Sequence, residues 1–95
     1  MKDVYILSTK FGRVTLNSQE EIEDTLRDII KTNYLLMELG QVLRIKLEKL
    51  VDNEYVIAPV CLDTAVRKLD SEDWYGYTLT DFTRGVTTLE RTSYE

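Results

Sequence analysis

The clearest pattern in the chain is a strict alternation of apolar and charged residues near its middle. From Val42 to Glu48, apolar side chains at every second position are separated by arginine, lysine and glutamate. A period of two is that of a half-buried β-strand, with one side on a core and the other in water. The polar residues 52–54 then supply turn chemistry, and Tyr55–Val60 reads as a returning strand. We therefore expect the chain to be organised around a central β-hairpin.

A helical pattern begins at Ser18. Ser18-Gln19-Glu20-Glu21 is a capping box, in which the serine hydroxyl accepts a hydrogen bond from the Glu21 amide and the Glu21 carboxylate reaches back. Isoleucine and leucine at positions 22, 26, 29 and 30 form one apolar stripe. Acidic residues in the first turn and Lys31 in the last suit the helix dipole. The pattern predicts a long helix over residues 18–32.

Further segments have the apolar or threonine-rich composition of short strands. The run Leu35–Leu39 also fits an extension of the long helix, because a short apolar run is ambiguous; we interpret it as a strand. With the central hairpin these segments predict about five to seven strands: Val4–Leu7, Arg13–Leu16, Leu35–Leu39, Tyr77–Phe82 and Val86–Arg91.

A second, short helix is predicted over residues 63–70, capped by Asp63. Pro59 cannot donate a ladder hydrogen bond, so the returning strand is expected to lie at an edge or to end there. With 95 residues the chain is long enough for one domain, residues 1–95, but not for two. The predicted class is α+β: an antiparallel sheet with the long helix packed on one face.

Composition places the chain among ordinary globular proteins. It is 43% hydrophobic and 31% charged, and no apolar run approaches the roughly 20 residues that a membrane span needs. The N-terminus has no apolar segment with a cleavage site. The single cysteine, Cys61, cannot form an internal disulfide. We therefore predict a cytoplasmic protein without a membrane segment.

Candidate chemistry is sparse. The chain contains no histidine, which removes the commonest general base and metal ligand. Cys61 then lacks an activating partner and is interpreted as an inert thiol. The carboxylates of residues 70–77 fail the calcium-loop spacing, because Trp74 stands where a third ligand belongs. We predict no enzyme, no cofactor and no metal site.

The densest cluster of potential binding residues is the acidic, aromatic stretch 70–77. Tryptophan and tyrosine bury large areas on binding, and carboxylates at their rim steer a basic partner. An acidic row at i, i+4 and i+8 on the long helix extends this field. The simpler alternatives are that Trp74 caps the core and that the helix row is a solvated face. The predicted protein-binding residues are Asp70, Glu72, Asp73, Trp74, Tyr75, Tyr77, Glu20, Asp24 and Asp28.

The sequence thus favours a small acidic protein-binding module, of the kind that bacteriophages use to inhibit or adapt a host protein by occupying its surface. Its partner is expected to carry a basic surface. One alternative is nucleic-acid binding by a basic strand face, although the net charge of −5 argues against it. The other is a self-assembling subunit whose sheet edges pair into a homodimer. The basic strand face of the nucleic-acid alternative would consist of Lys10, Arg13, Arg44, Lys46 and Lys49.

Overall fold

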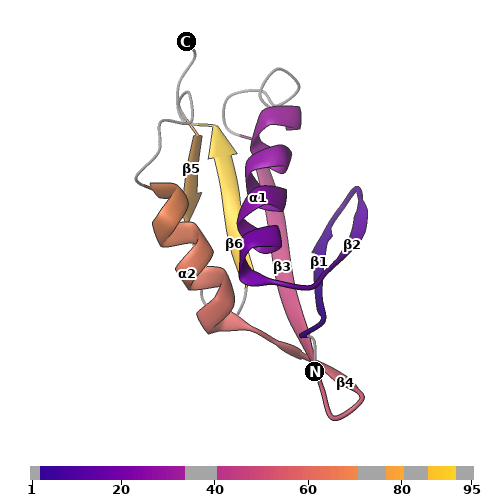
Figure 1. The fold of residues 1–95 in the computed structure, drawn as a ribbon. Coiled ribbons are helices and arrows are strands. Elements are labelled where there is room, and N and C mark those ends of the chain that lie inside the picture. Colours follow the sequence, from indigo (N-terminus) through magenta and orange to yellow (C-terminus); the bar gives the residue numbers. More distant parts are fainter. Residues whose placement is uncertain (1–2, 34–40, 71–76, 81–85, 92–95) are drawn as a thin grey trace.

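The fold has two layers, an antiparallel sheet and two helices that both lie on one of its faces (Figure 1). The computed structural model describes residues 3–33, 41–70, 77–80 and 86–91. This arrangement confirms the predicted α+β class. The described residues form six strands and two helices: β1 (Tyr5–Thr9), β2 (Gly12–Leu16), α1 (Gln19–Asn33), β3 (Val42–Val51), β4 (Glu54–Ile57), α2 (Pro59–Asp70), β5 (Tyr77–Thr80) and β6 (Val86–Arg91).

Strand β3 is the centre of the sheet. The strand order is β2-β1-β3-β6-β5, and β4 also pairs with β3. One edge of β3 pairs with β1, which sets Leu47 opposite Leu7. The other edge pairs first with β6, where Leu43 lies opposite Leu89, and further along with β4. Three strands therefore take their register directly from β3.

The predicted alternation along β3 is confirmed. Leu43, Ile45 and Leu47 are at most 2% exposed, whereas Val42 is 51% exposed. The buried side of β3 packs under the apolar stripes of both helices. The fully buried helix residues are Ile22, Leu26 and Ile30 of α1 and Leu62, Ala65, Val66 and Leu69 of α2.

The predicted cap of α1 forms as expected. The Glu21 amide donates to the Ser18 Oγ at 3.1 Å, and the Glu21 carboxylate accepts the Asn17 amide at 2.5 Å. At the other end the helix stops at Asn33, whose Nδ2 donates to the Ile29 carbonyl at 2.7 Å. The Ser18 hydroxyl thus satisfies a first-turn amide that has no partner within the helix, and the Glu21 and Asn33 side chains add hydrogen bonds at the two ends.

The β3–β4 turn explains how the central hairpin reverses tightly. Asp52 and Asn53 have φ values of 51° and 66°, so both central residues lie in the left-handed region. Two such residues form the turn whose twist matches that of paired strands, and Asn and Asp tolerate this conformation well. The turn chemistry predicted for residues 52–54 is therefore confirmed, with Glu54 already in β4.

The start of the second helix differs from the prediction. Helix α2 begins at Pro59 rather than after Asp63, and β4 ends at Ile57 rather than at Val60. The Leu62 amide donates to the Ala58 carbonyl at 3.2 Å, so Pro59 occupies the first helical position. Proline is favoured there because its missing N–H needs no partner and its φ already suits a helix. Pro59 therefore starts a helix as well as ending a strand.

The remaining predicted strands have different outcomes. The strands predicted as Val4–Leu7 and Arg13–Leu16 are present as the antiparallel pair β1 and β2. Those predicted as Tyr77–Phe82 and Val86–Arg91 are present as the antiparallel pair β5 and β6, with residues 81 and 82 outside the described residues. Gly12, which follows the first turn, has a φ of 145°, a conformation that side chains rarely adopt. The strand predicted for Leu35–Leu39 lies outside the described residues.

The two helices are joined by polar contacts as well as by the core. Glu23 of α1 is 5% exposed, and its carboxylate accepts a hydrogen bond from Lys68 Nζ of α2 at 2.9 Å. Gln19 Nε2 donates both to Glu23 and, at 2.9 Å, to the carbonyl of Cys61. These bonds satisfy a buried carboxylate that would otherwise be costly, and they fix the position of α1 relative to α2.

The burial of one side of β3 predicts a sharp contrast between neighbouring positions. Ile45→Asp should unfold the domain, because an unpaired charge enters a fully buried site and costs more than about 4 kcal/mol. Lys46→Asp, on the exposed side, should change the free energy of unfolding by no more than about 1 kcal/mol. Urea denaturation measures both variants, and equal tolerance of the two would contradict the assignment of the buried side.

Candidate binding groove between the first hairpin and α1

The helix layer does not cover the whole sheet. Leu7 of β1 and Val14 of β2 lie opposite each other in register, so their side chains are on the same, helix-bearing side of the sheet. Leu7 is 1% exposed, but Val14 is 44% exposed. The helix layer therefore covers β1 and, in β2, Leu16 at its end, but it leaves residues 12–15 of β2 open, with a strip between them and α1.

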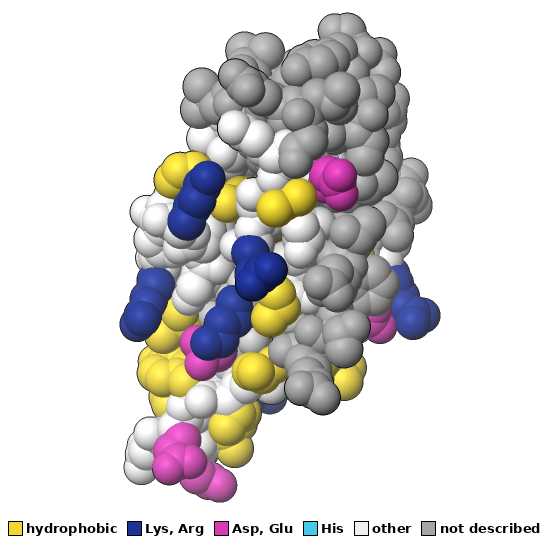
Figure 2. Space-filling view, turned by 180° about the vertical axis from the view of Figure 1, so that it is seen from behind, with side chains coloured by type: hydrophobic (Ala, Val, Ile, Leu, Met, Phe, Trp, Pro, Cys, Tyr) yellow, Lys and Arg dark blue, Asp and Glu magenta, His cyan; other side chains and the backbone are white. Residues whose placement is uncertain are grey.

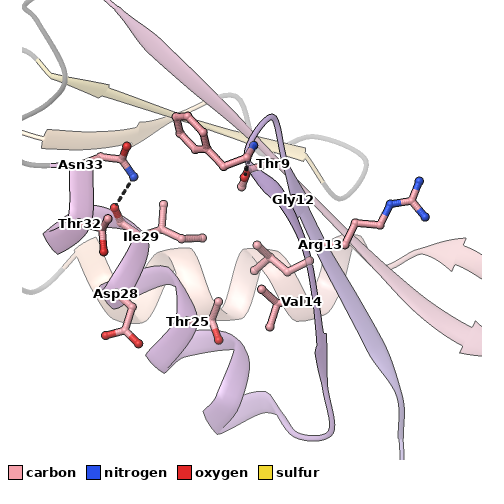
Figure 3. A pocket seen from close by; sticks show the side chains of 11 residues that line it. Thr9, Gly12, Arg13, Val14, Thr25, Asp28, Ile29, Thr32 and Asn33 are labelled. Atoms are coloured by element: carbon pink, nitrogen blue, oxygen red, sulfur yellow. Dashed lines mark hydrogen bonds between the residues drawn. The ribbon is translucent and has the colours of Figure 1, made fainter.

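This strip forms a groove of about 530 Å³. Its volume falls within the roughly 300–1,000 Å³ of typical ligand sites. Figure 3 shows Ile29 pointing from α1 towards the hairpin, and the guanidinium of Arg13 pointing away from α1. One wall comes from the first hairpin and the other from α1; the lining residues are Leu7, Thr9, Phe11, Gly12, Arg13, Val14, Thr25, Asp28, Ile29, Thr32 and Asn33.

Phe11 gives the groove an exposed aromatic side chain. It lies in the turn between β1 and β2 and is 69% exposed, although it is among the largest apolar residues in the chain. The Phe11 amide donates to Thr9 Oγ1 at 3.1 Å, and Lys10 Nζ lies 5.1 Å from the ring centroid. The turn is thus held locally while the ring stays available, and exposed aromatic rings are frequent anchors in protein interfaces.

The α1 wall gives the groove an acidic rim. Asp28 is exposed and lines the groove, and Glu20 and Asp24 are exposed on the same helix. Asp24 accepts a hydrogen bond from Arg27 at 3.0 Å. Among the described residues no ion pair involves Asp28 or Glu20. The predicted acidic row is therefore exposed, and one of its members lies beside an apolar groove.

The rest of the predicted site cannot be placed against this groove. Four of its residues, Glu72, Asp73, Trp74 and Tyr75, lie outside the described residues. Asp70 ends α2 and Tyr77 begins β5, but only their backbone is described. The apolar groove residues Leu7, Phe11, Val14 and Ile29 were not predicted as binding residues. An apolar residue in a turn, as Phe11 is, was the one signal in the sequence that pointed to them.

The face of the sheet away from the helices is a second exposed surface. Arg13, Ser8 and Lys46 lie in one row across three strands, and Arg44 follows on β3, so three predicted cations share this face. Figure 2 shows basic and apolar side chains intermixed there. Lys49 instead shares the helix-bearing side with Tyr5, and its Nζ lies 3.7 Å from Asp3. The five cations predicted to gather on one face are therefore divided.

Cys61 lies in the first turn of α2, half-buried, and its thiol is 3.7 Å from the Tyr5 hydroxyl, to which it donates. Tyr5 itself is 5% exposed. Burial raises the pKa of Tyr5 to about 12, and Cys61 and Asp3 add to the effect. The neutral phenol is thus part of the core.

Within the described ranges, no three Cys, Asp or Glu side chains are grouped closely enough to hold a metal ion. No helix in the described part of the chain has the length and apolar character needed to cross a membrane.

Comparison of the chain with protein-family models, curated proteins and solved structures finds no match.

The environment of Tyr5 predicts a loss of stability at high pH. Between the ordinary tyrosine pKa of about 10 and the value of about 12 in the folded protein, the unfolded chain releases this proton first. The contribution to stability is complete below pH 10 and is lost as the pH rises through 12. Between pH 9 and 12, the free energy of unfolding measured by denaturation should fall more steeply with pH for the native protein than for Tyr5→Phe. Parallel pH dependences of the two proteins would contradict this.

Proposed function

We propose that this protein is a small binding module that acts by occupying a surface of another protein, with the groove between the first hairpin and α1 as its contact site. The observation that carries the proposal is the exposure of Phe11 and Val14 beside the acidic rim of α1. Apolar side chains exposed together in a concave site lose water favourably when a partner covers them.

Charge supports a partner with a basic surface. Asp28 lines the groove, Asp24 and Glu20 are exposed on the same helix outside the lining, and the whole chain has a net charge of −5. Such a field speeds the encounter with a cationic surface and repels an anionic one. The same balance disfavours nucleic acid at the groove, whose phosphates would meet these carboxylates.

The partner is proposed to be a protein because of how the groove is built. It has one exposed aromatic side chain, Phe11, and its lining combines apolar residues with polar side chains such as Thr25, Asp28 and Thr32. A surface of this kind suits a protruding segment of a partner, which contributes a few large anchors surrounded by polar contacts.

The test is comparative capture from the cells in which the protein occurs. The immobilised protein should retain a partner that the double variant Phe11→Ser, Val14→Ser binds at least about tenfold more weakly. Both side chains are exposed, so the variant should keep its thermal stability. The matched control is Val42→Ser, Val60→Ser, which removes two equally exposed apolar residues outside the groove lining and should bind normally.

A second control separates the groove from the open face of the sheet. Arg44→Glu, Lys46→Glu reverses two cations on that face and should leave capture unchanged. The proposal fails if this variant loses the partner while the groove variant keeps it. If the immobilised protein retained only nucleic acid, and the Arg44→Glu, Lys46→Glu variant lost it, the open face would be the functional surface instead.

A further inference from the structure

Strand β2 has a free edge beside the groove. It is the first strand in the sheet order, it pairs with β1 on one side, and no described strand pairs with its other side. Every second residue of such a strand directs its N–H and C=O groups away from the sheet. Proteins usually protect an exposed edge with charge, proline or a covering segment. The groove side of β2 carries Gly12, Val14 and Leu16, none of which is charged.

A strand that pairs with this edge would place side chains in the groove without any rearrangement of β2 or α1. Successive side chains of a strand point to opposite faces, so alternate side chains of an added strand would enter the groove between β2 and α1. There they would meet Val14 and Ile29. Gly12 adds room, because a Cβ at this position would have no heavy atom within 4 Å.

The charges beside the edge differ between the two faces. On the groove side Asp28 stands at the rim, and no ion pair with it is present among the described residues. On the other face Arg13 projects from β2 itself. A segment lying along this edge is therefore favoured if it carries lysine or arginine on its groove side, whereas basic residues on its other side would meet Arg13.

We infer that the groove binds an extended segment of a partner protein, which adds as a strand to the free edge of β2. Its groove-side positions are apolar with one lysine or arginine that reaches Asp28, and its backbone pairs with β2. Strand addition of this kind takes affinity from main-chain hydrogen bonds and specificity from alternate side chains. This inference rests on the proposed function and specifies the partner at the same site.

The length of β2 sets the length of the segment. Five residues span about 17 Å at the rise of a β-strand, so a bound segment of five to six residues is sufficient. A helix lying in the groove would instead present apolar side chains at i, i+3, i+4 and i+7 and would leave the β2 edge unpaired. Strand addition and helix binding are therefore distinguished by the spacing of the apolar side chains in the bound segment and by whether its backbone pairs with β2.

The probe is a display library of random dodecapeptides, selected on the full chain and counter-selected on the Phe11→Ser, Val14→Ser variant. Enriched sequences should have apolar residues at alternate positions with lysine or arginine on the same side. Single N-methylation along a synthetic copy of the most enriched peptide should weaken binding by about tenfold or more at every second residue. Methylation at the intervening residues should have little effect.

Asp28→Asn should lower the affinity for the most enriched peptide by roughly two- to fivefold. Replacing its basic residue with norleucine should remove that difference. Glu20→Gln, which changes the same acidic row outside the groove lining, is the matched control and should bind normally.

Helical spacing among the enriched peptides, or N-methylation effects without a period of two, would overturn the strand-addition inference. So would the absence of any groove-dependent peptide, or enrichment of segments of this chain itself, which would make a second copy the occupant. In each case the proposed function still holds if capture of a cellular partner depends on Phe11 and Val14. If capture does not depend on them, both the proposed function and the strand-addition inference are wrong.

Discussion

The fold depends on the burial of one side of β3. Leu43, Ile45 and Leu47 are covered by the two helices, and the same strand sets the register of β1, β4 and β6 through its backbone. A shift of β3 by one residue would turn its charged side chains into the core, so this register is strongly specified. Strands β2 and β5 then attach one step further out, at the two ends of the strand order.

The candidate binding site follows from the difference in width between the two layers. Helices α1 and α2 are held together by core packing and by the contacts of Glu23 with Lys68 and Gln19, so they sit side by side, with α2 at the β5 edge of the sheet and α1 nearer β3 (Figure 1). Strand β2 extends beyond them. Its groove-facing residue Val14 remains exposed, although the residue paired with it, Leu7, is buried. The groove is thus a consequence of the packing that stabilises the core.

Features that depend on short-range patterns could be predicted from the sequence. The alternation of β3 and the cap at Ser18 each need only neighbouring residues, and both are present in the structure. A proline suits two roles, the end of a strand and the first turn of a helix, and for Pro59 only the first was predicted. The groove and the buried position of Glu23 depend on residues far apart in the chain, which no local pattern reports.

The central claim is that a central strand, β3, supports an edge strand, β2, whose outer side pairs with no other strand in the described part of the chain. Native-state amide hydrogen exchange of the isolated protein tests it most directly, because exchange reports which backbone groups are paired. The account predicts that amides of β3 exchange slowest, with the free energy of global unfolding, while every second amide of β2 exchanges fast. Uniform protection of β2 at the level of β3 would show that its edge is already covered and would contradict the account.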